Sequence, residues 1–241
     1  MSRKHILPNS RGRKLKRIVI TIDGPAGSGK STTAKLVARR LGYLYLDTGA
    51  MYRAMTLKAL RTGIDLDDPE VLAQQARDTD VTVETEPDGT RVVLDGEDVT
   101  DRLRELEVTQ KSSVVAAAKG VRTRMVELQR KIGANGGIVA EGRDIGSVVF
   151  PDAEVKIYLD ADLSARASRR KKELDAGGNL VDITRIERDM GARDAYDSGR
   201  EHSPLVVPAG AIIVDTTNLT IDGQVERVVE EAEKVIGGEG S

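Results

Sequence analysis

The segment Gly24-Pro25-Ala26-Gly27-Ser28-Gly29-Lys30-Ser31 has the spacing G-x-x-x-x-G-K-S. Glycines in such a loop let successive backbone N–H groups turn toward phosphate oxygens, which larger side chains would obstruct. A lysine in the seventh position can bridge the outer phosphates of a nucleoside triphosphate, and a hydroxyl in the eighth can ligate Mg²⁺. We therefore expect this segment to bind a nucleoside triphosphate, with Lys30 in a catalytic role and Ser31 as the magnesium ligand.

The residues on either side of this loop predict the elements that would hold it. Residues 18–22 (IVITI) form a β-branched run that is typical of a strand buried on both faces. Residues 31–41 have apolar side chains at helical spacing, so a helix is predicted to begin where the loop ends. The start of a helix carries a partial positive charge that favours phosphate. Strand, loop and helix in this order are the context that the phosphate-binding motif requires.

Polar side chains also follow two other short apolar runs, in the segments Asp47–Arg53 and 141–144 (EGRD). Side chains beyond the carboxyl ends of parallel strands face the ligand crevice of an α/β sheet. Thr48 is expected either to cap a helix that begins near Ala50 or to meet a phosphate. Arg53, one turn further on, can place its guanidinium against a phosphate dianion. These segments are therefore candidates for the acceptor side of a phosphoryl transfer.

The alternation of strands and helices predicts the fold class. Apolar runs predict five strands at 18–22, 43–46, 138–140, 155–159 and 211–214, and helical patterns lie at 31–41, 50–60, 163–174, 183–196 and 222–236. Such alternation favours an α/β fold with a five-stranded parallel sheet flanked by helices.

Two segments interrupt this pattern. Residues 63–104 contain a helix near 69–76 and a hairpin around a turn at 87–89, which predicts a small antiparallel insert. Residues 166–200 are rich in Arg, Lys and Asp with two glycines in the middle, which is typical either of a solvated helix pair or of a short helical lid.

Composition excludes several other chemistries. The 241 residues include no cysteine and only two histidines, which excludes disulfides and thiol catalysis and disfavours a histidine metal centre or a Ser-His triad. Five tyrosines, one phenylalanine and no tryptophan leave few side chains for stacking on single-stranded nucleic acid. The sequence has neither a long apolar run nor a secretory h-region, so we expect a soluble, cytoplasmic protein with no membrane partner. It also lacks the guanine-reading N-K-x-D pattern of GTPases.

The first residues differ in charge from the remainder. Residues 1–17 carry seven Arg or Lys and no acidic residue, although the whole chain has a formal net charge of −2. We expect residues 1–16 to be a disordered basic leader and residues 17–241 to form the folded domain. A basic arm could instead contact nucleic acid, and that alternative stays open.

Five segments together resemble the bacterial cytidylate kinase family, a branch of the P-loop nucleoside monophosphate kinases. They are IDGPAGSGKST (22–32), LDTGAMYR (46–53), VAEGRDIGSVVFPDAEVKIYL (139–159), RDAYDSGREHSPL (193–205) and VDTTNLTID (214–222). The resemblance runs from about residue 17 to residue 236. It implies that residues 63–104 enlarge the monophosphate-binding region and that residues 166–200 form the lid. Glu141 and Thr48 stand where some members carry Asp and Ser, and each keeps the functional group.

The resemblance also implies roles for individual residues. The triphosphate cradle would extend to Thr32. The acceptor phosphate would be held by Thr48, Arg53, Arg143 and Arg200. The cytosine edge would be read by Ser113, Arg122 and Asp144. The ribose or a neighbouring phosphate would meet Arg193 and Asp197. The donor phosphates would be approached by Arg166, Arg169 and Arg170. Of these, Arg143, Arg193, Arg200 and Arg169 would share the catalytic work with Lys30.

The implied activity is a Mg²⁺-dependent transfer of the γ-phosphoryl group from ATP to CMP or dCMP by a monomer that needs no nucleic acid partner. Cytosine presents an exocyclic amine that suits the Asp144 carboxylate, where uracil presents an acceptor. A related kinase acting on shikimate, gluconate, AMP or UMP is the main alternative, and a panel of acceptors would distinguish them.

Overall fold

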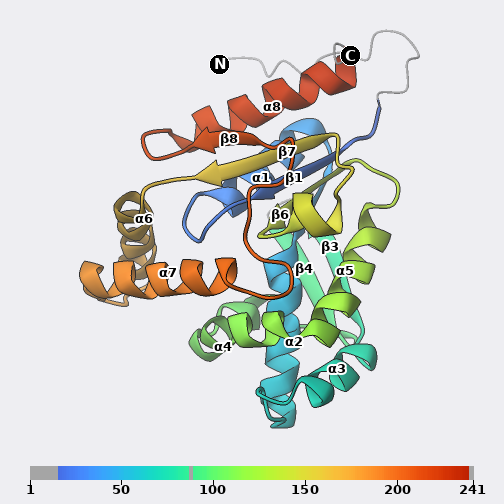
Figure 1. Ribbon diagram of the computed structural model, residues 1–241, viewed down its shortest axis with the longest axis vertical. Coiled ribbons are helices and arrows are strands. Elements are labelled where there is room, and N and C mark those ends of the chain that lie inside the picture. The colour runs from blue at the N-terminus through green and yellow to red at the C-terminus, as the bar shows by residue number, and fades with distance from the viewer. Residues whose placement is uncertain (1–15, 87–88, 239–241) are drawn as a thin grey trace.

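The computed structural model describes residues 16–86 and 89–238 (Figure 1). The expected leader therefore lies outside the described residues, except for Lys16, and so do two of the three residues of the turn at 87–89.

A five-stranded parallel sheet forms the centre of the molecule, as the sequence predicts. Its spatial order is β2-β6-β1-β7-β8, with β1 in the middle paired to β6 on one side and β7 on the other. The strands are β1 (Val19–Asp23), β2 (Leu44–Asp47), β6 (Ile138–Gly142), β7 (Val155–Asp160) and β8 (Ile212–Asp215). Their carboxyl ends lie at one edge of the sheet, where the phosphate-binding loop begins directly after β1.

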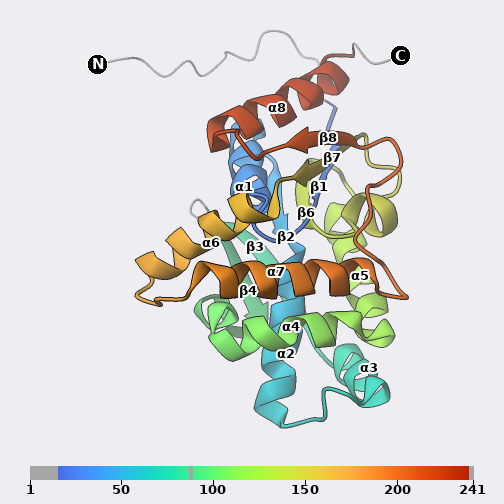
Figure 2. The ribbon, with the colours of Figure 1, turned by 60° about the vertical axis from the view of Figure 1, so that its left-hand side comes forward.

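Helices cover both faces of this sheet (Figures 1 and 2). In the described residues they are α1 (Lys30–Leu41), α2 (Thr48–Thr62), α3 (Pro69–Arg77), α4 (Leu106–Ala117), α5 (Lys119–Gly133), α6 (Leu163–Ala176), α7 (Ile183–Ser198) and α8 (Ile221–Gly237). Two short turns accompany them, a 3₁₀ turn η1 (Thr100–Arg104) and a π-helical turn η2 (Ile145–Val149).

The core has two parts because successive side chains of a strand point to opposite faces. In β6, Ile138 and Ala140 join a cluster with α2, α4 and α5, whereas Val139 joins a cluster with α1 and α8. All three are buried, which explains why this strand has no polar alternation in the sequence.

The insert contains a second, antiparallel sheet. It consists of β3 (Val81–Glu86), β4 (Gly89–Leu94) and β5 (Glu97–Asp98) in that order. Its buried side chains, Val81, Val92 and Leu94, belong to the same cluster as those of α2 and α5. The insert therefore shares its apolar core with one face of the main sheet.

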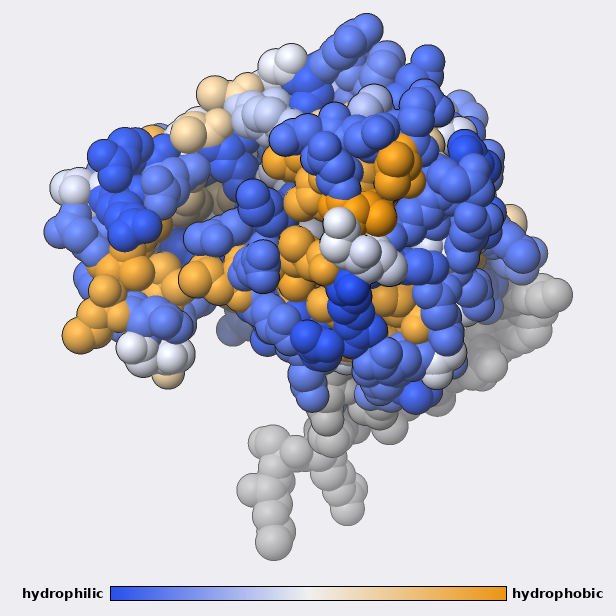
Figure 3. Space-filling view, turned by 90° about the horizontal axis from the view of Figure 1, so that it is seen from below, coloured by the Kyte–Doolittle hydropathy of each residue, from blue (hydrophilic) through white to orange (hydrophobic). Residues whose placement is uncertain are grey.

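Helices α6 and α7 form a hairpin that projects from the body, visible as a lobe when the molecule is seen from below (Figure 3). Its own core is small, with Ala167, Ile186 and Met190 buried and Ala26 of the phosphate-binding loop packed against them. At the tip, Leu180 is 87% exposed. The hairpin thus rests on the phosphate-binding loop through few apolar contacts.

One of the two alternatives expected for Thr48 was wrong. Thr48 does not cap α2: the helix begins at Thr48, and the Asp47 side chain accepts the cap hydrogen bond from Ala50 N at 2.8 Å. No bounds were predicted for α4 and α5, the helices that carry Ser113 and Arg122. Among residues 16–86 and 89–238, no helix combines the length and apolar character needed to cross a membrane.

Candidate active site

The phosphate-binding loop joins β1 to α1 with its glycines in conformations that other residues rarely adopt. Gly24 has φ +146° and Gly29 has φ +96°. A side chain would also not fit: a Cβ on Gly24 would lie 2.0 Å from Leu159 O, and one on Gly29 would lie 2.6 Å from Gln224 Oε1. The sequence motif therefore corresponds to a loop whose backbone is held tightly between β7 and α8.

Lys30 is buried at the first position of α1, and its Nζ donates to Pro25 O at 2.6 Å. Burial and the nearby Arg143 lower the pKa of Lys30 to about 7, against the opposing effect of Glu141 and Asp23. Burial and the neighbouring guanidinium group both disfavour the charged form of Lys30, and an added anion would offset both effects. The loop is thus electrostatically prepared for phosphate.

Ser31 lies next to the buried carboxylate of Glu141, the fourth residue of β6. Its Oγ donates to Glu141 Oε1 at 2.7 Å, and the Tyr45 hydroxyl lies 3.4 Å from the same oxygen. Burial and the nearby Asp47 raise the pKa of Glu141, while Lys30 opposes this. A hydroxyl and a carboxylate fit Mg²⁺, which usually takes one or two protein oxygens together with substrate phosphates. These two residues would hold the ion.

Three arginines surround the carboxylate of Asp197, which is 1% exposed. Arg143 Nε donates to Asp197 Oδ2 at 3.0 Å, Arg200 donates to Oδ1, and Arg193 Nε lies 4.0 Å from Oδ2. Arg200 also lies over the ring of Tyr196, 5.4 Å from its centroid. The structure thus brings Arg143, which follows β6, together with residues at and just after the end of α7.

This arginine cluster (Arg143, Arg193 and Arg200) has more positive charge than Asp197 can balance. Burial and Arg143 lower the pKa of Arg193 to about 10, although Asp197 opposes this. The Arg193 side chain is 38% exposed, but its Nε atom is buried without a hydrogen-bond partner. An unbalanced group of guanidinium ions is suited to bind a phosphate dianion.

Thr48 and Arg53 lie on the β2 side of the crevice. Thr48 is buried, and its Oγ1 donates to Glu141 O at 2.7 Å. Arg53 Nη2 donates to Asp47 Oδ2 at 2.9 Å, and Arg53 is among the charges that lower the pKa of Arg193. Arg53 is therefore close to the arginine cluster. The hydrogen bond of the Thr48 hydroxyl connects the start of α2 to β6.

Arg122 and Asp144 form a buried ion pair, with 6% and 5% of their side chains exposed. Arg122 also donates to Ala116 O at 3.1 Å, and it lies over the Tyr52 ring at 5.3 Å from the centroid. Ser113 is half-buried on α4, one turn before Ala116, and none of the interactions that define this pair involves its hydroxyl. The structure therefore joins two of the three residues expected to read the base.

The arginines expected in the lid have different surroundings. Arg166 Nη1 donates to Ala26 O at 3.1 Å and to the carboxylate of Asp194. Arg169 donates to Thr216 O and to Thr216 Oγ1, and it lies 3.4 Å from Gly27 O. Arg170 forms an exposed pair with Glu173 at 2.9 Å. Arg166 and Arg169 thus contact the phosphate-binding loop through its carbonyls.

Several buried residues of this region were given no role from the sequence, among them Asp23, Tyr52 and Gln224. Asp23 is an acid directly before the first motif glycine, at the end of an apolar strand, and this unusual position was a usable signal. Gln224 accepts from Thr33 Oγ1 at 2.8 Å, and it lies on α8, far along the sequence. No local pattern could have placed Gln224 beside the loop.

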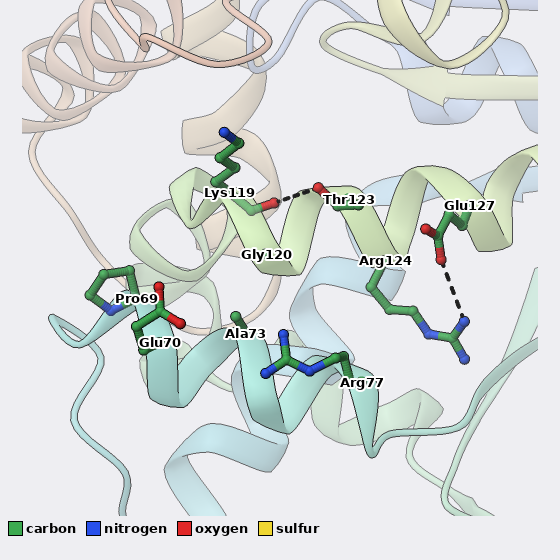
Figure 4. A pocket seen from close by; sticks show the side chains of 9 residues that line it. All are labelled: Pro69, Glu70, Ala73, Arg77, Lys119, Gly120, Thr123, Arg124 and Glu127. Atoms are coloured by element: carbon green, nitrogen blue, oxygen red, sulfur yellow. Dashed lines mark hydrogen bonds and ion pairs between the residues drawn. The ribbon is translucent and has the colours of Figure 1, made fainter.

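Two of the hollows among the described residues lie outside the phosphate-binding loop. One, of about 360 Å³, is lined by Arg122 and His202 among others, so it lies beside the Arg122–Asp144 pair. The other, of about 580 Å³, lies between α3 and α5 and includes Ala73 and Gly120 (Figure 4). It contains none of the residues expected to bind substrate.

A phosphate-binding loop at the end of a central parallel strand, opposite a group of arginines, is the arrangement of a P-loop phosphotransferase. Consistent with this, the cytidylate kinase family model matches residues 20–234. The chain belongs to the cytidylate kinase family and is a kinase. It is 49% identical to the cytidylate kinase of Caldanaerobacter subterraneus subsp. tengcongensis over 92% of this chain and 97% of that protein. It is 50% identical to the cytidylate kinase of Desulfitobacterium hafniense over 89% and 92% of the two chains.

Similarity to a solved structure supports the fold alone. An uncharacterised protein from Eubacterium ventriosum aligns with a TM-score of 0.50 at 13% identity, covering 91% of this chain and 99% of that one.

Proposed function

We propose that this kinase transfers the γ-phosphoryl group of ATP to CMP or dCMP, giving ADP and CDP or dCDP. The observation that carries the proposal is the buried Arg122–Asp144 pair next to the arginine cluster. The named relatives, cytidylate kinases that align over nearly their whole length, support the same acceptor. One group of residues then binds the acceptor phosphate and the other recognises its base.

The chain's own residues act mainly by position and charge. Lys30 and the loop N–H groups hold the donor phosphates, and the arginine cluster, with Arg53, holds the acceptor phosphate. Ser31 and Glu141 would hold Mg²⁺, which would supply the positive charge that offsets the charge of the donor phosphates. The two anions are thereby brought into line, which accounts for most of the catalysis in phosphoryl transfer. No general base is required because the acceptor oxygen is already ionised.

Base selection follows from the Asp144 carboxylate. Cytosine offers an exocyclic amine that can donate to this carboxylate, and Arg122 can donate to the ring acceptors. Uracil places a carbonyl oxygen where cytosine has its amine, so two acceptors would face each other in a buried site. Ser113 joins this pair in the proposal on the family resemblance alone.

The remaining expectations belong to the same proposal. Residues 63–104 serve as the enlarged monophosphate-binding insert and residues 166–200 as the lid, with Arg169 close enough to the loop to approach the donor phosphates. The kinase acts as a cytoplasmic monomer on small-molecule substrates, without a nucleic acid partner.

An ADP-release assay with ATP and Mg²⁺ tests the proposal against CMP, dCMP, UMP, AMP, GMP and shikimate. We expect rapid turnover with CMP and dCMP and little with UMP. Turnover confined to another acceptor would keep the kinase and refute the base-reading residues. Absence of turnover with all six would refute the proposal.

The variant Asp144→Asn tests the base-reading role directly. Its amide can present a donor to uracil, so the ratio of CMP to UMP turnover should fall by about 10- to 100-fold. Asp98→Asn is a matched control, since Asp98 also pairs with an arginine, Arg91, but in the β3–β5 sheet. An unchanged ratio in Asp144→Asn would contradict the assignment.

A further inference from the structure

Asp23 connects the two substrate sites. It is the last residue of β1, it is fully buried, and it directly precedes Gly24 of the phosphate-binding loop. Its Oδ1 accepts a hydrogen bond from Ile145 N at 2.8 Å, and its Oδ2 accepts one from Gly146 N at 2.7 Å. Both oxygens of one carboxylate therefore bind consecutive backbone N–H groups of a different segment.

That segment directly follows two residues that the proposed function assigns to the acceptor. Ile145 and Gly146 open the turn η2, directly after Arg143 and Asp144. The first N–H groups of a helical turn have no partner within it, and Asp23 supplies that partner. The turn η2 also fixes the backbone of Asp144, because Val148 N donates a hydrogen bond to Asp144 O at 2.9 Å. The backbone of the base-reading residue is thus fastened to the strand that carries the phosphate-binding loop.

The two hydrogen bonds from Ile145 N and Gly146 N to Asp23 lie directly beyond the last backbone pair between β1 and β6. Strands β1 and β6 pair up to Asp23 and Gly142, and beyond this point the chains separate. The turn also packs closely against β1, because a Cβ on Gly146 would lie 2.7 Å from Thr21 Oγ1. The position of η2 therefore depends on a side chain of β1 and on the lack of one at Gly146.

We propose that Asp23 is a positioning residue that holds Arg143 and Asp144 at the correct distance from the phosphate-binding loop. This inference rests on the proposed function, since it assigns those two residues to the acceptor. Asp23 itself touches neither substrate and acts through the backbone of η2.

The choice of a carboxylate supports this role. Burial raises the pKa of Asp23 to about 6, opposed by the hydrogen bonds from Gly146 and Ile145, so ionisation at this position is unfavourable for the fold. A neutral side chain would avoid that cost, but an amide has only one acceptor oxygen and would point its NH₂ at the second N–H group. Only the ionised carboxylate accepts both hydrogen bonds in this geometry.

The test compares Asp23→Asn with Asp68→Asn. Asp68 also accepts hydrogen bonds from two consecutive backbone N–H groups, those of Glu70 and Val71 at the start of α3, but through Oδ1 alone, so an amide at this position can keep both. In Asp23→Asn we expect kcat with CMP to fall by about 100-fold, the cost of a misplacement of about 1 Å. The ratio of CMP to UMP turnover should fall as well, while the equilibrium affinity for ATP should stay within about twofold of wild type. Asp68→Asn should change none of these values below its melting temperature.

A second variant alters the turn η2 itself and leaves the carboxylate of Asp23 unchanged. Gly146→Ala should displace η2 from β1 and give the same combination of lower kcat, lower CMP-to-UMP ratio and retained ATP affinity. This variant decides the question if Asp23→Asn does not fold.

Two results would overturn the proposal. One is a folded Asp23→Asn enzyme with unchanged kcat and base selectivity. The other is a loss of ATP affinity with unchanged selectivity, which would make Asp23 a support of the loop alone. The wild-type acceptor panel separates this outcome from failure of the proposed function. If the wild type uses another acceptor, kcat with that acceptor and ATP affinity still test whether Asp23 positions η2.

Discussion

At the scale of single residues, the burial of Lys30 determines what its removal should do. Lys30 is 4% exposed, and the pKa of its ammonium group is lowered to about 7 by burial and by Arg143, so the charge costs stability in the absence of an anion. Lys30→Ala should therefore remain folded, while kcat/KM falls by at least about 10²- to 10³-fold because charge on the transferring group is no longer neutralised. ADP-release kinetics and circular dichroism measure both, with the exposed Lys131→Ala as control. Undiminished turnover would contradict the role of the loop.

The buried carboxyl of Asp23 predicts a particular dependence of stability on pH. Its pKa in the folded protein is about 6, above its usual 3.8, because of burial; Asp144 contributes to the increase and Lys30 opposes it. Between pH 6 and pH 4 the folded state binds this proton more tightly than the unfolded chain does. Wild type should therefore gain stability relative to Asp23→Asn as the pH falls from 7 to 4, by up to about 3 kcal/mol. Urea unfolding of both proteins at the two pH values measures this difference, and a constant difference would contradict the prediction.

Individual site residues were predictable where a motif fixes their spacing. The loop Gly24–Ser31 could be assigned from the sequence because its chemistry depends on neighbouring backbone groups. The central place of Asp197 among three arginines could not be derived, since it depends on how α7 meets the end of β6. For the same reason, the double hydrogen bond of Asp23 to η2 connects residues more than a hundred positions apart and leaves no local signal.

At the scale of elements, the bounds of a helix could be predicted where the sequence has a capping residue or a proline at its start. Helix α3 begins with Asp68 as cap and Pro69 in the first turn, and it was predicted within one residue at its end. Helices α4 and α5 begin after Glu105 and Ala118, neither of which makes a side-chain cap hydrogen bond. Without those signals, their bounds could not be read from the sequence.

The contact between α3 and α5 gives a prediction for packing. A Cβ on Gly120 would lie 2.2 Å from Ala73 Cβ, so the helices touch along this line (Figure 4). Gly120→Ala should destabilise the protein by about 1–3 kcal/mol through overpacking, even though alanine favours helix by about 1 kcal/mol over glycine. Ala73→Gly removes the opposing methyl group, so the double variant should be more stable than the sum of the two single effects predicts. Urea unfolding of the four proteins gives this coupling, and simple additivity would contradict the close approach.

At the scale of the whole molecule, the general architecture was predictable and the sharing of its core was not. Alternating strand and helix patterns predict the parallel sheet, and the turn and hairpin signals predict the antiparallel insert. The sequence could not show that Val81 and Val92 of that insert belong to the same apolar cluster as Met51 and Met125. This depends on contacts across the chain, which local periodicity does not record.

The unequal size of the apolar clusters predicts that the α6–α7 hairpin unfolds locally more readily than the main sheet and the helices packed on it. Among the described residues of the α6–α7 hairpin, only three apolar side chains, Ala167, Ile186 and Met190, form a buried cluster, whereas the clusters on both faces of the main sheet are much larger. Backbone amides of α6 and α7 should therefore exchange hydrogen faster than those of α2, because local opening of the hairpin exposes little apolar surface.

Binding of CMP with a non-hydrolysable ATP analogue should slow exchange in the hairpin more than in α2, since Arg166 and Met190 rest against the loop that holds the donor. Hydrogen-exchange mass spectrometry of the free and bound protein measures both effects. Equal exchange rates in α7 and α2 of the free protein would mean that the hairpin and the body form one cooperative unit, with no separate lid to close.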